Sequence, residues 1–248
     1  PTRRSSDLSL YFYPVFTSSL NANRGLTLTG STTFNGALAL SGASTRTVTQ
    51  RTINLGDTTT WSAGSFNTGS GAVFNNTGIF LDQNTAANAL NYNLGGAVST
   101  FNNTGTYTKS GAGTTTISAT LNNSGAGAIN VNASTLALSG TSTIGSALDI
   151  ASGATLDYSG GTHALNGVSA GTGTGTLGIS GGTVTTSAAN GFAGQLLISG
   201  GTLNVNGTMN AATYTQSSGT LVFTFNASAT PTAATRTSAS SATVPGAM

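Results

Sequence analysis

One serine in the chain lies in a pattern that is typical of a catalytic nucleophile. Residues 178–182 read GISGG and match G-x-S-x-G, which presents a serine, here Ser180, on a sharp bend between a strand and a helix. That chemistry also needs an acid and a histidine later in the chain, but the only histidine, His163, precedes the serine. The same serine recurs in LDYSGG and LLISGG, so we interpret Ser180 as a repeat residue. We expect His163 to be a surface or corner residue and not a ligand.

Two aspartates are close enough in sequence to be considered as a pair of acids. Asp149 and Asp157 lie in LDI and LDY, and paired carboxylates are the signature of glycoside hydrolases. They are eight residues apart, so we expect them on different faces of one coil, with Asp57 and Asp82 several coils away. A polysaccharide-degrading enzyme is therefore an alternative, and the main prediction is that the chain is not an enzyme.

The remaining site patterns predict no cofactor or metal. GTGTLG at 173–178 fits G-x-G-x-x-G, but no helix is expected after it to present its N-terminus to a phosphate. The sequence has no His/Asp cluster and no calcium-binding G-G-x-G-x-D pattern. It also has no cysteine, which excludes disulfides and thiolate metal sites. We therefore expect no catalytic, cofactor-binding or metal-binding residues.

The composition favours strands and argues against nucleic-acid binding. Only 5% of the 248 residues are charged, all five acids are Asp, and the only Lys is Lys109. An ordinary soluble protein has about 25% charged residues. The net charge is +2, and there is no basic patch of the kind that binds nucleic acid. Because Thr, Val, Ile and aromatic residues suit a pleated strand, the chain is predicted to be all-β.

Short repeats organise the chain between residues 26 and 226. The pattern L-x-L-S-G, or a close copy of it, occurs at 26–30, 38–42, 136–140, 156–160, 177–181 and 196–200. The last four copies start at intervals of 20, 21 and 19 residues. FNNTG occurs at 74–78 and 101–105, and LNNSG at 121–125. A period near 20 is typical of solenoids, so we predict a single-stranded parallel β-solenoid of roughly ten coils, with about 20 residues per coil.

The core follows from the alternation of side chains along a strand. The large residues of each repeat should point inward and stack one coil apart. The residues expected in these buried rows are Leu136, Leu138, Leu156, Leu177, Ile179, Ile198, Phe74, Phe101 and Leu121. In FNNTG, we expect the two asparagines to make the bend and to form an amide ladder along the rod, and the glycine to adopt a positive φ.

The outward positions of the L-x-L strands bear on a possible ice-binding function. These positions are Thr27, Ala39, Ala137, Asp157, Gly178 and Leu197. They form no threonine ladder, although TTTIS at 114–118 and GTGTGT at 171–176 are rich in threonine. Ice binding therefore stays an alternative function.

Four segments are expected. Residues 1–8, PTRRSSDL, resemble the translation of a sequencing adapter and are interpreted as an artefact. Residues 9–25 form an uncertain N-terminal segment, and residues 26–226 form the solenoid. Residues 227–248 are a low-complexity linker or a truncated tail. No run of 18 apolar residues occurs, so no membrane span is predicted.

Residues 109–140 resemble the autotransporter-associated β-strand repeat of filamentous-haemagglutinin-type secreted proteins. Lys109, Gly111, Gly113 and residues 138–140 fit the family pattern, whereas LNNSG at 121–125 replaces its aromatic Asn-Thr-Tyr segment. The resemblance implies a right-handed parallel β-helix that is extracellular or displayed on the bacterial cell surface. It also implies a non-enzymatic, adhesin-like rod that binds an unknown protein or glycan.

Two further expectations concern the surface. The rod is expected to self-associate end to end, because solenoid ends present unpaired strand edges. Sequons begin at Asn75, Asn102, Asn122, Asn132, Asn206 and Asn226. We expect no glycan on the first three, and low odds of one at Asn206 and Asn226.

Overall fold

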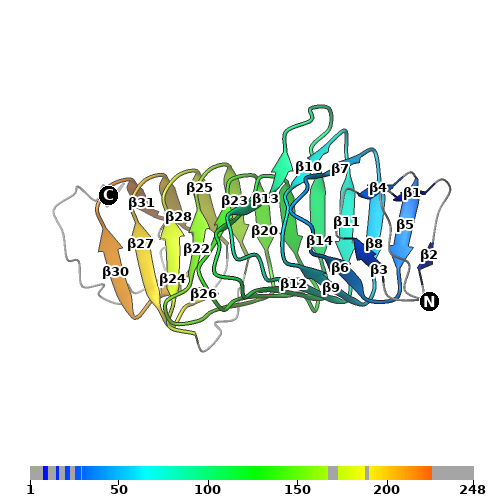
Figure 1. Cartoon of the computed structure of the whole chain (residues 1–248). Coiled ribbons are helices and arrows are strands. Elements are labelled where there is room, and N and C mark those ends of the chain that lie inside the picture. The colour runs from blue at the N-terminus through cyan, green and yellow to red at the C-terminus, as the bar shows by residue number, and fades with distance from the viewer. Residues whose placement is uncertain are drawn as a thin grey trace.

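The chain winds into a parallel β-solenoid (Figure 1). The computed structural model describes residues 30–166, 173–187 and 190–224, together with the backbone of four strands between residues 8 and 28. These residues contain strands and no helix, and they form about nine turns with about 21 residues in each. The predicted all-β solenoid is therefore confirmed.

Three strands make up a typical turn, and each belongs to a different parallel sheet. The eleven-stranded sheet contains β2 (Val15–Phe16), β5 (Ser31–Phe34), β8 (Thr52–Leu55), β11 (Val73–Asn76), β14 (Thr100–Asn103), β17 (Thr120–Asn123), β20 (Ser142–Ile144), β23 (Thr162–Leu165), β25 (Thr183–Thr186), β28 (Thr202–Val205) and β31 (Thr220–Phe223). The seven-stranded sheet contains β3 (Leu20–Ala22), β6 (Leu38–Leu40), β9 (Thr58–Trp61), β12 (Ile79–Asp82), β15 (Thr106–Lys109), β18 (Ala128–Val131) and β21 (Ala147–Ile150).

The third side is a nine-stranded sheet, and two short pairs complete the set. The nine-stranded sheet contains β7 (Arg46–Thr49), β10 (Phe66–Gly69), β13 (Asn88–Tyr92), β16 (Thr115–Ile117), β19 (Thr135–Leu138), β22 (Thr155–Tyr158), β24 (Thr176–Ile179), β27 (Gln195–Ile198) and β30 (Thr213–Gln216). The short pairs are β1 (Leu8–Leu10) with β4 (Leu26–Leu28), and β26 (Asn190–Gly191) with β29 (Met209–Asn210).

Parallel pairing begins before residue 26. Strand β1 pairs with β4, β2 pairs with β5, and β3 pairs with β6. The predicted segment of residues 9–25 therefore contributes strands that pair with the solenoid. Of residues 1–8, which were assigned to an artefact, Leu8 is the first residue of β1 and pairs with Leu26, whereas residues 1–7 lie outside the described residues. The predicted tail of residues 227–248 also lies outside them.

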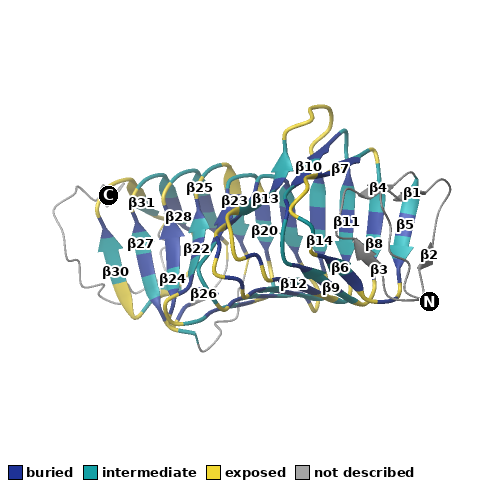
Figure 2. Cartoon of the chain, in the orientation of Figure 1, coloured by how far each residue is buried: buried dark blue, intermediate teal, exposed yellow. Residues whose placement is uncertain are grey.

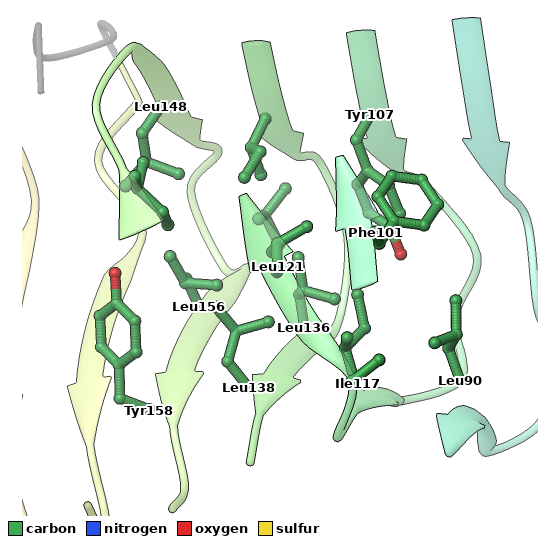
Figure 3. Close-up of a cluster of buried hydrophobic side chains, with 14 of the residues drawn as sticks. Leu90, Phe101, Tyr107, Ile117, Leu121, Leu136, Leu138, Leu148, Leu156 and Tyr158 are labelled. Carbon is green, nitrogen blue, oxygen red and sulfur yellow. The ribbon is translucent and has the colours of Figure 1, made fainter. Parts of the chain in front are cut away.

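The core forms because most of the strands whose side chains the structure describes alternate inward and outward residues (Figure 2). In β14, Phe101 and Asn103 are buried while Thr100 and Asn102 lie outside. Parallel pairing then places like residues on top of one another, as in Leu136, Leu156 and Leu177. Side chains from the three sheets meet in the interior, as the labelled residues of Figure 3 show. Burying each large apolar side chain contributes about 1.5–3 kcal/mol.

The predicted core residues are all buried. None of the nine is more than 3% exposed: Leu136, Leu138, Leu156, Leu177, Ile179, Ile198, Phe74, Phe101 and Leu121. Aromatic rings fill the N-terminal half of the core. Phe80 and Tyr107 stack with ring centroids 5.4 Å apart, and Phe101 meets both rings edge-on.

The asparagines of FNNTG end a strand and do not make the bend, so that part of the prediction is wrong. Asn75 and Asn76 are the last two residues of β11, with Asn76 inside and Asn75 outside. The predicted amide ladder exists, but it is double, because one asparagine of each pair points to each side. The inner ladder joins Asn76 to Asn103 (2.6 Å) and Asn103 to Asn123 (2.7 Å), so that the amide nitrogens of Asn76 and Asn103 are paired, whereas Oδ1 of Asn76 has no partner.

The glycines of the corners have two different roles. Gly105 does not have a positive φ, contrary to the prediction, but a Cβ atom there would lie 2.1 Å from the Gly78 carbonyl oxygen. Only glycine therefore allows consecutive corners to pack this closely. In the S-G-G corners, Gly161, Gly182 and Gly201 have φ values of 73°, 65° and 61°, which favour glycine.

Candidate binding surfaces

Ser180 joins two turns of the solenoid and is paired with Asp157, not with a histidine. Its hydroxyl donates a hydrogen bond of 2.7 Å to Oδ2 of Asp157, and its backbone N–H donates one of 3.2 Å to Oδ1. Asp157 is outward and lies beside Gly178 in the next turn. The half-buried aspartate thus holds the S-G corner of the following turn.

His163 is buried, which corrects the prediction that it lies at the surface or at a corner. It is 1% exposed on β23, where the alternation that buries Leu165 also points His163 inward. A carbonyl can only accept, so Nε2 donates to the Gly160 carbonyl oxygen, and Nδ1 accepts from the Ser142 hydroxyl at 2.8 Å. Burial lowers the pKa of His163, an effect that the Gly160 hydrogen bond and Asp157 oppose.

The aspartates do not form a catalytic pair. Asp149 lies on the outside of the seven-stranded sheet and accepts the Gly173 N–H at 2.8 Å, whereas Asp157 lies on the nine-stranded sheet. They occupy different faces, as predicted. Asp57 accepts the Thr58 N–H at 2.7 Å, and Asp82 is fully buried. Within the described part of the chain, no three His, Asp, Glu or Cys side chains gather to hold a metal ion.

The G-x-G-x-x-G match does not form a phosphate-binding loop. Its last residues, Thr176 to Gly178, lie within strand β24. The Gly173 and Gly175 N–H groups donate to Asp149 and to the Ile150 carbonyl oxygen, respectively. These donors are therefore used between turns.

A buried polar cluster lies inside the seven-stranded sheet, and the sequence did not predict it. Asp82 and Lys109 end β12 and β15, are register partners, and are both fully buried. Tyr107 donates to Oδ2 of Asp82 at 2.9 Å, and Asn84 donates to Oδ1 at 2.8 Å. Burial raises the pKa of Tyr107 well above 10.0, with Asp82 adding to the effect. Burial lowers the pKa of Lys109, which Asp82 partly opposes.

The outer face of the eleven-stranded sheet carries a regular row that we call the threonine row. Its members, one from each turn, are Ser31, Thr52, Val73, Thr100, Thr120, Thr141, Thr162, Thr183, Thr202 and Thr220. Register pairing aligns nine of them, and Thr141 directly precedes β20, whose first residue Ser142 pairs with Leu121 and His163. Eight of these ten are threonine. The equivalent row of the seven-stranded sheet is mixed and reads Thr58, Ile79, Thr106, Ala128 and Ala147. The nine-stranded sheet carries a shorter outward run that is also rich in threonine, namely Thr135, Thr155, Thr176, Gln195 and Thr213. The threonine row of the eleven-stranded sheet is therefore the longer of two such runs.

A second row, the amide row, lies two residues further along the same strands. Its members are Thr33, Asn54, Asn75, Asn102, Asn122, Thr143, Ala164, Thr185, Asn204 and Val222. Asn75, Asn102 and Asn122 donate in turn to the preceding asparagine at 2.8, 2.9 and 3.0 Å. These three asparagines begin sequons. Their amides were expected to form a ladder inside the rod, but they form the ladder on the outside. Asn132 and Asn206 are exposed, and Asn226 lies outside the described residues.

The outward L-x-L positions whose side chains are described lie on the two other sheets. Ala39 belongs to the seven-stranded sheet, whereas Ala137, Asp157, Gly178 and Leu197 align on the nine-stranded sheet. These positions form no threonine ladder, as stated, and the side chain of Thr27 lies outside the described residues. The threonine row was visible as T-x-N or T-x-T at 52–54, 100–102, 120–122, 141–143, 183–185 and 202–204.

One turn is longer than the others and carries an exposed loop. Phe74 and Phe101 are register partners although they are 27 residues apart, because residues 93–98 form an additional loop between β13 and β14. All six of these residues are exposed, including Leu94 at 43% and Val98 at 50%. The loop rises above the neighbouring corners at the top of Figure 2. Hydrogen bonds of 2.7 Å from Ser70 and Gly71 to its carbonyls hold it in place.

Among the described residues, the structure contains no helix that is long and apolar enough to cross a membrane. No protein-family model, no curated protein and no solved structure matches the chain.

Proposed function

We propose that this chain is a secreted or surface-displayed, adhesin-like structural rod of bacterial type, without enzymatic activity. The observation that supports the proposal most directly is the exposed loop at residues 93–98 on an otherwise regular solenoid. Insertions in a repeat array gather on binding faces, and loops held by a rigid scaffold often carry recognition. Leu94 and Val98 supply the apolar contacts, and an unidentified protein or glycan of a neighbouring surface is the partner.

Binding through this loop is tested with beads that carry the purified chain. We expect the beads to be retained on at least one of three coatings: collagen, a mixed glycan array or fixed bacterial cells. A variant without residues 93–98 has a shorter corner, like those of the other turns, and should lose this retention. Its circular dichroism and melting temperature should match those of the original chain. Equal retention of both proteins would show that the loop is not the binding contact. If neither protein were retained on any coating, the adhesin proposal would be contradicted.

Display outside the cell is tested separately in the source organism. Protease added to intact cells should digest the chain while a cytoplasmic marker survives. Survival of the chain in intact cells and its digestion after lysis would contradict the localisation. End-to-end association of the purified rod, through strands such as β31 at the end of the eleven-stranded sheet, is part of the same proposal. Light scattering that shows a monomer at high concentration would contradict it.

Ice binding is a second candidate function, and the threonine row favours it. Neighbouring turns of a solenoid are about 4.8 Å apart, and alternate residues of a parallel strand are about 6.6 Å apart. The two outer rows therefore form a nearly rectangular array, and its repeats are similar to those of water on a face of hexagonal ice. The β-branched threonines are stiff, and the amide row is held by its own hydrogen bonds. Such a preorganised surface loses little entropy when it orders water.

The side chains of this face also disfavour the common macromolecular partners. Neither row contains a charged or an aromatic residue. Protein interfaces depend mainly on Trp, Tyr and Arg, and nucleic acids require basic side chains. The face therefore suits water better than either class of partner.

A paired substitution tests the ice-binding function. Thr120→Tyr with Thr162→Tyr places bulk in the threonine row, whereas Thr58→Tyr with Thr106→Tyr places it on the seven-stranded sheet as a control. We expect the original chain and the control to enter growing ice and to produce thermal hysteresis, and the threonine-row variant to lose both. Exclusion of the original chain from ice would end this candidate.

A polysaccharide-degrading enzyme is the remaining alternative. Its test is hydrolysis of plant or algal glycans and the effect of Asp157→Ala. Because Asp157 holds the corner at Ser180, we expect no hydrolysis by either protein.

A further inference from the structure

An amine, a carboxyl and a carboxamide lie together inside the rod at the seven-stranded sheet. Asp82 and Asn84 point inward from one turn, and Lys109 points inward from the next, where it is the register partner of Asp82. The exposed fraction of all three residues is 0%. None of the proposed binding functions uses this cluster, and enclosing three such groups has a free-energy cost.

The carboxamide of Asn84 is positioned and only half satisfied. Its Nδ2 donates to Oδ1 of Asp82 at 2.8 Å, and its backbone N–H donates to the same oxygen at 3.2 Å. Its Oδ1 is buried and has no hydrogen-bond partner. Tyr107 occupies the other oxygen of Asp82. The carboxyl group is therefore held against the amide nitrogen, while the amide carbonyl is left without a stabilising donor.

The Lys109 side chain extends from Asp82 toward the level of Asn84. Its Nζ donates to the Gly111 carbonyl oxygen, two residues further along the chain. Gly111 lies directly against Asn84, because a Cβ atom at Gly111 would be 2.1 Å from the Asn84 backbone oxygen. Burial lowers the pKa of the Lys109 amine and so favours its uncharged form, which is the nucleophile.

We propose that Lys109 and Asn84 form an intramolecular isopeptide bond that links two consecutive turns. The Nζ lone pair attacks Cγ of Asn84, the new C–N bond forms, and the bond from Cγ to Nδ2 breaks. Asp82 accepts a proton from the attacking amine and delivers it to the departing Nδ2, which leaves as ammonia. The products are a secondary amide and ammonia, and no oxidant or other reactant is needed.

The positions of the three groups and the apolar side chains around them favour formation of the amide. Lys109 ends β15, and Asn84 lies two residues after the end of β12 in the neighbouring turn, so the reaction of the two groups is intramolecular and needs no diffusional encounter. Trp61, Phe80 and Tyr107 bury the inward side of the same sheet and keep water from competing. The amide product also removes the cost of an enclosed amine.

The mass of the purified full-length chain tests the proposal. We expect an intact mass that is lower than the sequence mass by one ammonia. The positions of the basic residues provide a second readout, because after Arg51 the chain contains only Lys109 and Arg236 as trypsin sites. Trypsin does not cleave after an acylated lysine. The denatured chain should therefore yield one fragment, 52–236, in place of the two fragments 52–109 and 110–236.

Three variants identify the roles of the groups. Lys109→Arg and Asn84→Ala should show the full sequence mass, and Asn84→Ala should be cleaved after Lys109. Asp82→Asn lacks the carboxylate that transfers the proton, so it should still have no bond between Lys109 and Asn84 at a time when the original chain is completely linked. These readouts do not depend on the stability of the variants, because the original chain carries the decisive mass.

Several outcomes would overturn the proposal. One is an original chain with the full sequence mass and normal cleavage after Lys109. Loss of one water in place of ammonia would assign the bond to Asp82. Loss of ammonia with normal cleavage after Lys109 would indicate a cyclised asparagine and no link between the turns.

Discussion

The side-chain amide of Asn103 donates a hydrogen bond of 2.7 Å to Oδ1 of Asn123, its register partner in the next turn. On the outside of the sheet, the neighbouring pair makes an amide hydrogen bond in the opposite direction, from Asn122 to Oδ1 of Asn102 at 3.0 Å. Identical chemistry thus occurs twice, once away from water and once beside it. The two ladders allow the contribution of burial to be measured.

Removing the inner amide should destabilise the rod more than removing the outer one. Asn103→Ala leaves Oδ1 of Asn123 without its donor in the interior, and a buried group left unsatisfied costs about 1–3 kcal/mol. In Asn102→Ala, water can reach the half-buried partners, and the loss should be about 0.5 kcal/mol. Urea denaturation of both variants measures the difference. Equal losses would mean that the inner ladder is solvated.

Close packing of the corners predicts a contrast between two glycines. In Gly105→Ala, the new Cβ atom would lie 2.1 Å from the Gly78 carbonyl oxygen, which is backbone and cannot turn away. We expect a loss of at least about 1–3 kcal/mol. Gly145→Ala meets its nearest atom at 3.8 Å, and its stability should change little or rise by about 0.4–1 kcal/mol. Thermal melting distinguishes the two, and similar behaviour would contradict the packing argument.

Truncating a stacked leucine should create a cavity. Leu138 is 1% exposed and lies under Tyr158 of the next turn, so Leu138→Ala should cost about 2–5 kcal/mol. Leu197 points outward from the same sheet and is the matched control. Leu197→Ala should cost less than about 1 kcal/mol, as measured by urea denaturation. A loss below that value for Leu138→Ala would show that the site collapses without a cavity.

The buried histidine predicts that the protein is less stable in mild acid. The folded-state pKa of His163 lies below its usual value of 6.5, so the unfolded chain binds a proton first as the pH falls. The contribution of neutral His163 to the free energy of unfolding is therefore complete above about pH 6.5. It decreases as the pH falls from there through the pKa that His163 has in the folded chain. Urea denaturation midpoints measured at several values between about pH 5 and pH 8, a range that spans the usual histidine pKa, test this dependence.

His163→Gln supplies the comparison for this pH dependence. The variant cannot titrate near neutrality, so its stability should change little over the same range. A slope as steep as that of the original chain would assign the effect to another group.

The sequence predicted the winding of the chain but not which side each strand occupies. Alternating leucines and a period near 20 were enough for the solenoid and for the buried rows. The pattern L-x-L, however, occurs at Leu38–Leu40 on the seven-stranded sheet and at Leu136 and Leu138 on the nine-stranded sheet. All three sides use the same alternation, so a row on the eleven-stranded sheet could not be separated from the others by pattern alone.

Two errors have specific physical origins. His163 was assigned to the surface from its polarity, although the alternation with Leu165 already placed it inside. Asp82 and Lys109 were not associated because the exposed loop puts 27 residues between them, outside the repeat period. One longer turn in the repeat period brings the two residues into register.

The stacking of parallel turns determines how the rod should respond to mechanical force. Its backbone hydrogen bonds run from turn to turn, along the axis, so a pull on the two ends loads them one turn at a time. Each released turn of about 21 residues would lengthen the chain by roughly 70 Å. A rod tethered at both ends would therefore extend in steps under load. The rupture of the hydrogen bonds of one turn after another would dissipate mechanical energy before the attachment at either end fails.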